Sequence, residues 1–105
     1  MINQISPEEL KSQLSKNKNL ILIDVRESWE YEITNIPGAK NIPLGQVPKI
    51  ANEFPHDSEI VVYCHHGVRS MRAANFLVPL GFKNVRNLIG GIDNYRNVDE
   101  TIKKY

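Results

Sequence analysis

The hydrophobic positions of the chain fall into two kinds of segment that alternate along its length. Short continuous apolar runs at 20–25 and 59–64 are rich in branched residues, which is typical of strands covered on both faces. A further strand is expected at 84–91, and a brief extended piece lies at 39–45 around Ile42. Because strands alternate with helical patterns over a short chain, the sequence predicts an α/β fold whose parallel sheet carries helices on both sides.

The predicted helices are marked by caps and by apolar residues three or four positions apart. Ser6 is the expected N-cap of the first helix, with Pro7 at the first helical position and Glu9 completing a capping box. Leu10 and Leu14 give this helix an inward stripe. Further helices are expected at 46–54, 68–82 and 98–105.

The helix predicted at 68–82 has an apolar stripe of its own. The stripe consists of Ala73, Ala74, Leu77 and Leu80. Pro79 removes one backbone hydrogen bond and is expected to bend or shorten the last turn, after which Gly81 ends the helix.

Composition narrows the class of protein and its setting. The 105 residues, 41% hydrophobic and 24% charged, are expected to form one domain over 1–105. A formal net charge of +1 gives no reason to expect nucleic acid or a membrane as partner. The first ten residues lack the pattern of a signal peptide, and the single cysteine does not suggest an oxidising compartment, so we expect a cytoplasmic protein.

Cys64 follows a predicted strand and precedes a helix that begins near Val68 or Arg69. In parallel sheets, ligands bind outside the carboxyl ends of the strands. The N–H groups of such a loop and the positive end of the helix stabilise a thiolate, so we expect a lowered pKa for the Cys64 thiol. Gly67 permits the tight turn, and Arg69 adds a charge suited to an oxyanion.

Two interpretations of Cys64 follow from these residues. In the first interpretation Cys64 is a core thiol at the end of an apolar run, because free cysteine is among the most buried residue types. The second is a nucleophile, and it is favoured because the residues from His65 to Arg69 are poor core neighbours that offer several hydrogen-bond donors.

The histidines beside Cys64 raise the question of a metal site. Adjacent residues rarely converge on one ion, and no further ligand stands at metal-site spacing, so the sequence predicts neither a metal nor a cofactor. We expect His65 and His66 to contribute loop N–H groups and local positive character. A role for either as a general base stays open.

Asp24 and Arg26 lie at another predicted strand end. A carboxylate and a guanidinium at such a turn usually pair with each other or cap a helix, so we expect structural support rather than catalysis. The glycines at 90–91 are expected to make a tight turn before a helix rather than to hold a phosphate.

The chain resembles a single-domain rhodanese of the rhodanese-like sulfurtransferase family. The likeness rests on four stretches in the family's order, LIDVRESWEY, IPGAKNIP, VVYCHHGVRS and NVRNLIGGIDNY. It implies a rhodanese-like α/β fold with a central parallel sheet of about five strands and helices on both faces. His66 departs from the family pattern, which often has serine there, and this changes the chemistry of the pocket.

The resemblance also implies a mechanism in which Cys64 is the catalytic residue. Cys64 would take the outer sulfur of a donor such as thiosulfate, hold it as a persulfide and pass it to cyanide, a thiol or a sulfur-accepting protein. Arg69 would bind the sulfonate end of the donor. The substrate-binding loop so implied consists of His65, His66, Gly67, Val68, Arg69 and Ser70.

Two other classes of protein share these features. Cysteine-dependent phosphatases use the same fold with a loop one residue longer, whereas four residues separate Cys64 from Arg69 here. The tighter loop suits a single sulfur atom better than a phosphoryl group. Regulatory interaction modules of this fold typically lack the cysteine, whereas this chain keeps both Cys64 and Arg69.

Overall fold

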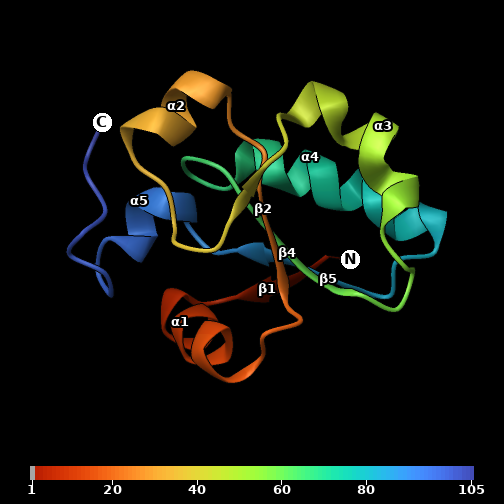
Figure 1. Cartoon of the computed structure of the whole chain (residues 1–105), viewed down its shortest axis with the longest axis horizontal. Coiled ribbons are helices and arrows are strands. Elements are labelled where there is room, and N and C mark those ends of the chain that lie inside the picture. The colour runs from red at the N-terminus through yellow and green to blue at the C-terminus, as the bar shows by residue number, and fades with distance from the viewer. Residues whose placement is uncertain (1) are drawn as a thin grey trace.

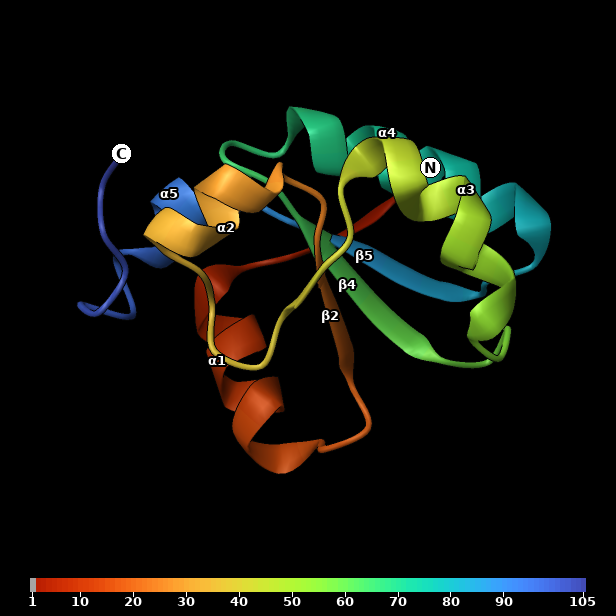
Figure 2. The same ribbon diagram turned by 45° about the horizontal axis from the view of Figure 1, so that its top comes forward.

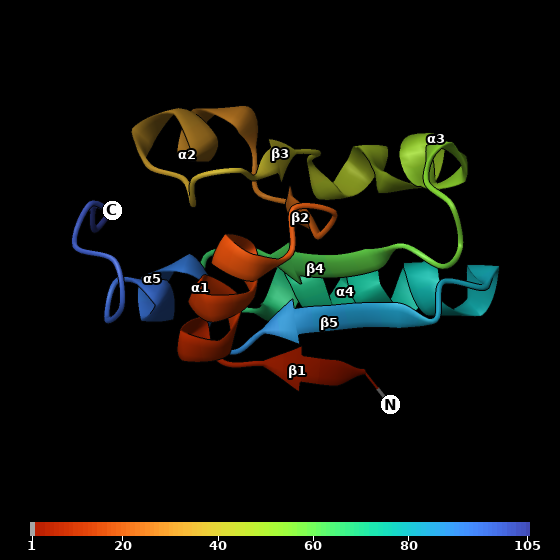
Figure 3. The same ribbon diagram turned by 60° about the horizontal axis from the view of Figure 1, so that its bottom comes forward.

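A five-stranded parallel sheet forms the centre of the molecule. The structure, a computed structural model, describes residues 2–105, and Met1, part of the domain predicted over 1–105, lies outside the described residues. The strands are β1 (Asn3–Ile5), β2 (Ile21–Asp24), β3 (Lys40–Asn41), β4 (Glu59–Tyr63) and β5 (Asn84–Leu88). Their order across the sheet is β1-β5-β4-β2-β3, and every pair is parallel, as Figure 3 shows with the strands seen side by side.

Helices cover both faces of this sheet, as the sequence predicts (Figure 1). The α-helices are α1 (Pro7–Lys16), α2 (Ser28–Ile33), α3 (Val47–Ile50), α4 (Val68–Leu77) and α5 (Gly91–Tyr95). Short 3-10 turns lie at Leu44–Gln46, Ala51–Glu53 and Val78–Leu80. The tilted view of Figure 2 shows α3 and α4 on one side of the sheet and α1 on the other. None of the helices described over residues 2–105 is long and apolar enough to cross a membrane.

The sheet separates two hydrophobic cores, and β4 contributes to both. Ile60 and Val62 pack with residues of α3 and α4, whereas Val61 and Tyr63 pack with residues of α1 and α5. Successive side chains of a strand point to opposite faces, which explains this division. Full burial of each large apolar side chain contributes about 1.5–3 kcal/mol, so β4 anchors the sheet.

The first helix forms as its capping signals predict. The Ser6 hydroxyl oxygen accepts the backbone N–H of Glu9 at 3.1 Å, and the Glu9 carboxylate accepts the backbone N–H of Ser6 at 3.4 Å. Leu10 is fully buried in the core beneath α1, and Leu14 packs at its margin.

The helix predicted at 68–82 is shorter than the apolar pattern suggests. Its α-helical part, α4, ends at Leu77, and the segment around Pro79 tightens into a 3-10 turn. This change in winding takes Leu80 off the inward stripe, and its side chain is 42% exposed, so its prediction as a stripe residue is wrong. Gly81 ends the segment with φ 106°, a left-handed conformation that favours glycine.

The predicted closing helix at 98–105 is wrong. This segment forms turns, in which the Asp99 carboxylate accepts both the N–H and the hydroxyl of Thr101. Such local side-chain bonds compete with helix formation. The last helix is α5, which begins at Gly91, the second glycine of the predicted turn. The sequence interpretation also missed the short β1 and α2.

Candidate active site

Cys64 directly follows β4 at the carboxyl edge of the sheet, before the start of α4 at Val68. The arrowheads in Figure 3 point to this edge, where α2, α5 and the C-terminal segment lie. The Cys64 side chain is only 1% exposed and belongs to the core beneath α4. Burial alone therefore fits a core thiol, and the hydrogen bonds around the sulfur distinguish the two interpretations.

The loop after Cys64 aims donors at the sulfur atom. The backbone N–H of Gly67 donates to Sγ at 3.0 Å, and the Ser70 hydroxyl lies 3.4 Å from Sγ. Gly67 has φ 107°, a left-handed conformation that directs its N–H inward and that a residue with a Cβ would resist. A ring of donors around one sulfur stabilises an anion on that atom.

These donors change the acidity of the thiol. Burial raises the pKa of Cys64, but hydrogen bonds from the Ser70 hydroxyl and from the N–H groups of Ser70, Gly67 and His66 outweigh it. The net result is a Cys64 pKa below that of an ordinary thiol. A core cysteine in apolar surroundings would show the opposite shift.

We expect alkylation of Cys64 by iodoacetamide to have a pH midpoint below the value of about 8.5 typical of a free thiol. The rate follows the thiolate fraction, so it should rise with pH through the lowered pKa and then level off. Cys64 is the only cysteine, so the label reports this site alone. In urea the midpoint should return to the ordinary value. A folded-state midpoint at or above that value contradicts the role given to the loop.

Asn87 of β5 holds the same loop from behind. Its amide donates to the Gly67 carbonyl at 3.2 Å, and its Oδ1 lies 2.5 Å from Ser70 Oγ, where it competes with Cys64 Sγ for the single hydroxyl proton. Asn87 is almost fully buried, and the sequence interpretation did not single it out. The available signal was its place in the strand, because Asn87 lies on the same face of β5 as the buried Val85 and directly before the buried Leu88.

Arg69 makes a contact that the sequence did not predict. Its two terminal nitrogens donate to the two carboxylate oxygens of Glu30 in α2, at 2.7 and 2.9 Å. The Arg69 guanidinium lowers the pKa of Glu30 to about 2, and Glu30 in turn raises the pKa of Arg69. The Arg69 charge, which was expected to face the sulfur donor, is thus already paired with a carboxylate. Glu30 is a further residue of the site, and sequence reasoning missed it.

Asp24 and Arg26 form a fully buried ion pair at the end of β2. The Arg26 Nη2 lies 2.7 Å from Asp24 Oδ2, and Arg26 Nε lies 3.0 Å from Oδ1. The same guanidinium donates to the Thr34 carbonyl and to the Tyr105 hydroxyl. Arg26 thereby ties the end of β2 to the end of α2 and to the C-terminal segment, which is a structural arrangement.

The two histidines stack face to face on the outer side of the loop. Their ring centroids lie 4.0 Å apart with an interplanar angle of 18°. His65 also stacks on Tyr105, with centroids 4.2 Å apart and an angle of 14°. The His66 side chain is 65% exposed and Val68 is 69% exposed, so these two side chains face outward, whereas Gly67 and Ser70 face the sulfur.

Asp93 of α5 brings a third potential metal ligand to the histidines. Ligand atoms of His65, His66 and Asp93 lie within 4.8 Å of one another, although sequence spacing gave no sign of it. The lone pairs of an imidazole lie in its ring plane, and these rings are nearly parallel. One ring would have to turn before both nitrogens could bind one ion, so the absence of a metal stays a prediction.

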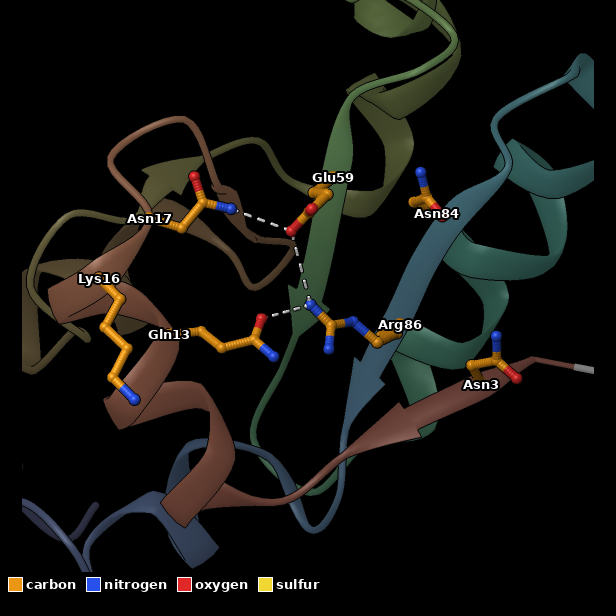
Figure 4. A pocket seen from close by; sticks show the side chains of 7 residues that line it. All are labelled: Asn3, Gln13, Lys16, Asn17, Glu59, Asn84 and Arg86. Carbon is orange, nitrogen blue, oxygen red and sulfur yellow. Dashed lines mark hydrogen bonds and ion pairs between the residues drawn. The ribbon is translucent and has the colours of Figure 1, made fainter.

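Two hollows on the surface differ in their relation to this site. One, of about 430 Å³, lies at the opposite end of the sheet, where Arg86 contacts Gln13 and Glu59 (Figure 4). The other, of about 530 Å³, adjoins the site, because His66, Gly67 and Val68 of the cysteine loop line it together with Ile89. Neither hollow is lined by a cysteine.

A parallel sheet with helices on both faces and a cysteine loop after β4 define a class of α/β domain. Comparison with known proteins identifies the family within this class. The family model described as "Rhodanese-like domain" matches residues 6–98. The chain belongs to the rhodanese-like domain family, in agreement with the resemblance seen in its motifs.

Two curated relatives and one solved structure illustrate the similarity. The chain is 41% identical over 99 residues to the putative sulfur carrier protein YrkF of Bacillus subtilis, covering 94% of this chain and 54% of that protein. It is 36% identical over 92 residues to a sulfurtransferase of Allochromatium vinosum, covering 88% and 86% of the two chains. A rhodanese-like domain protein from Staphylococcus aureus superimposes with TM-score 0.85 at 30% identity, covering 99% of each chain. The chain thus spans about half the length of the first relative.

Proposed function

We propose that this protein is a sulfurtransferase that carries sulfane sulfur as a persulfide on Cys64. The observation that carries the proposal is the donor set around a buried sulfur, with Gly67 N–H at 3.0 Å and Ser70 Oγ at 3.4 Å. This set favours an anionic sulfur, which both the thiolate and the persulfide require. The sulfur carrier and sulfurtransferase names of two relatives support the same class of reaction.

The reaction needs only one nucleophile from the protein. The Cys64 thiolate attacks the outer sulfur of thiosulfate, a sulfur–sulfur bond forms, and sulfite leaves with the electron pair of the bond that breaks. A cyanide ion or an acceptor thiolate then attacks the outer sulfur of the persulfide, and the Cys64 thiolate is released. No net oxidation of the protein occurs over the cycle.

Arg69 is proposed to bind the anionic end of the donor while it remains paired with Glu30. Its Nη1 and Nη2 each donate to a Glu30 oxygen, and its Nε is not used in that pair. A guanidinium has five N–H donors, so donors remain for a sulfonate oxygen. His65, His66 and Val68 are proposed to form the outer wall of this site.

Sulfur uptake by the folded protein tests the proposal. After incubation with thiosulfate, the intact mass should rise by one sulfur atom, about 32 Da, and dithiothreitol should reverse the change. Prior alkylation of Cys64 serves as the control, because the sequence has no other cysteine. An unchanged mass contradicts the proposal, and turnover of an aryl phosphate without sulfur uptake would favour a phosphatase.

The physiological acceptor is proposed to be a thiol, either of a small molecule or of a sulfur-accepting protein. A thiol acceptor requires a compartment in which thiols stay reduced, which agrees with a cytoplasmic setting and with the single free cysteine. Incubation of the persulfide form with a cysteine-containing carrier protein should transfer the additional mass to that protein. Retention of the sulfur by Cys64 would exclude that carrier as an acceptor.

A further inference from the structure

The C-terminal segment places an aromatic side chain on the cysteine loop. After α5 the chain turns back toward α2, as Figures 1 and 2 show at the end marked C. Ile102 is buried in the core, and the Lys103 N–H donates to the Thr34 hydroxyl at 2.9 Å. These two anchors bring Tyr105 against the outer side of the site.

The Tyr105 ring continues the stack of the two histidines. It lies nearly parallel to the His65 ring at 4.2 Å, and His65 lies at 4.0 Å from His66. Trp29 of α2 contacts the Tyr105 ring edge-on, with the two ring centroids 6.4 Å apart and an interplanar angle of 89°. The His65 imidazole is therefore held between two rings, one from its own loop and one from the C-terminal segment.

The Tyr105 hydroxyl joins the two ion pairs of the site. It donates to Glu30 Oε1 at 2.9 Å and accepts from Arg26 Nη1 at 2.8 Å. Arg26 pairs with Asp24, and Glu30 pairs with Arg69. One phenol thus connects the buried pair at the end of β2 to the arginine of the cysteine loop.

We propose that Tyr105 is a positioning residue for the Cys64 loop. Its hydroxyl fixes the Glu30 carboxylate that holds Arg69, and its ring fixes the His65 imidazole. The consequence for catalysis rests on the proposed function, because Arg69 and the loop N–H groups would meet the sulfur donor. The contacts themselves do not depend on that function.

Two variants separate the hydroxyl from the ring. Tyr105→Phe keeps the stack on His65 but removes the bonds to Glu30 and Arg26. Tyr105→Leu removes both the bonds and the stack. Tyr31→Phe is the matched control, because the Tyr31 hydroxyl donates to the Ala39 carbonyl at 3.2 Å, away from the cysteine loop.

Alkylation of Cys64 by a neutral and an anionic reagent measures the first effect without any sulfur transfer. In Tyr105→Phe, the preference for iodoacetate over iodoacetamide should fall about threefold to tenfold, the range expected for the loss of the one hydrogen bond that holds Glu30, the partner of Arg69. The reason is that Arg69 loses the fixed position from which it attracts a carboxylate. The iodoacetamide rate should stay as in the wild type.

The pKa of His65 measures the second effect. Burial lowers the pKa of His65, helped by His66 and Arg26, while Asp93 and Glu30 act in the opposite direction. Removing the ring that covers it should raise the His65 pKa in Tyr105→Leu, as followed by NMR, but not in Tyr105→Phe. In the same variant the iodoacetamide rate at neutral pH should fall severalfold, because the loop is less well held.

The results for the Tyr105 variants distinguish a positioning role from a purely structural one. They also show separately whether the positioning role or the proposed function fails. Wild-type reagent preference in Tyr105→Phe and a wild-type His65 pKa in Tyr105→Leu would overturn the proposal, even if both variants melt at lower temperature. If Tyr105→Leu does not fold, the reagent preference of Tyr105→Phe decides. If wild-type protein takes up no sulfur but these shifts occur, the proposed function fails and the positioning role stands.

Discussion

Cys64→Ser is expected to lower the rate of sulfur transfer from thiosulfate by at least about a thousandfold and to abolish sulfur uptake. An alcohol stays protonated at neutral pH and does not form a persulfide, whereas the thiol has a lowered pKa. The hydroxyl is smaller than the thiol and still accepts from the Gly67 N–H, so the variant should fold. Cyanide-dependent formation of thiocyanate is the measurement.

Two controls show whether the loss of activity in Cys64→Ser comes from the cysteine itself. Lys16→Ala, in the polar hollow at the other end of the sheet, should retain wild-type turnover. The circular dichroism spectrum of Cys64→Ser should match that of the wild type. Residual turnover above about one hundredth of the wild-type rate in Cys64→Ser would show that the cysteine is not the sulfur carrier.

Gly91→Ala is expected to destabilise the fold by about 3 kcal/mol and to disturb the cysteine loop. Gly91 has φ 63°, and a Cβ there would lie 2.6 Å from the Cys64 carbonyl oxygen and closer still to the His65 carbonyl. These carbonyls accept the N–H groups of Ile92 at 2.9 Å and Asp93 at 3.1 Å. The start of α5 therefore fits directly onto the loop, without space for a side chain.

Thermal unfolding and sulfur uptake measure the two consequences of Gly91→Ala. A loss of this size lowers the Tm of a domain of about 100 residues by roughly 10–20 °C. Uptake should also slow, because displacement of the carbonyls turns the loop N–H groups away from the sulfur. Gly45→Ala is the matched control, since a Cβ at Gly45 meets nothing within 4 Å. Equal effects of the two substitutions would contradict the close fit of α5 on the loop.

Local signals in the sequence were sufficient for most of the sheet and for the first helix. The apolar runs at 20–25 and 59–64 became β2 and β4, and the capping box at Ser6 opened α1. The helix predicted at 98–105 does not form, although the composition of the segment favours one, because Asp99 bonds to Thr101 and makes a turn there. β1 is only three residues long and depends on pairing with β5, a contact that no local pattern reveals.

The site was predictable where neighbours in the chain build it. Cys64, Gly67 and Ser70 lie in one loop and meet around the sulfur, and Asp24 pairs with Arg26 two residues away. The partners from other elements were not predictable in the same way. Glu30, Asn87 and Tyr105 reach the loop from α2, β5 and the C-terminal segment, so only the tertiary fold brings them there.

The order of the strands has a consequence for the growing chain. β5 is the last strand of the sheet to be synthesised, yet it lies between β1 and β4, so the sheet stays incomplete until β5 has been made. Pairings between such distant segments form slowly, and an unpaired strand edge is open to aggregation in the meantime. The cysteine loop leaves the ribosome before β5 supplies Asn87 and before Gly91 docks on it. A nascent chain that ends before β5 therefore carries an ordinary cysteine, and the lowered pKa of its thiol arises only after β5 and α5 have been made.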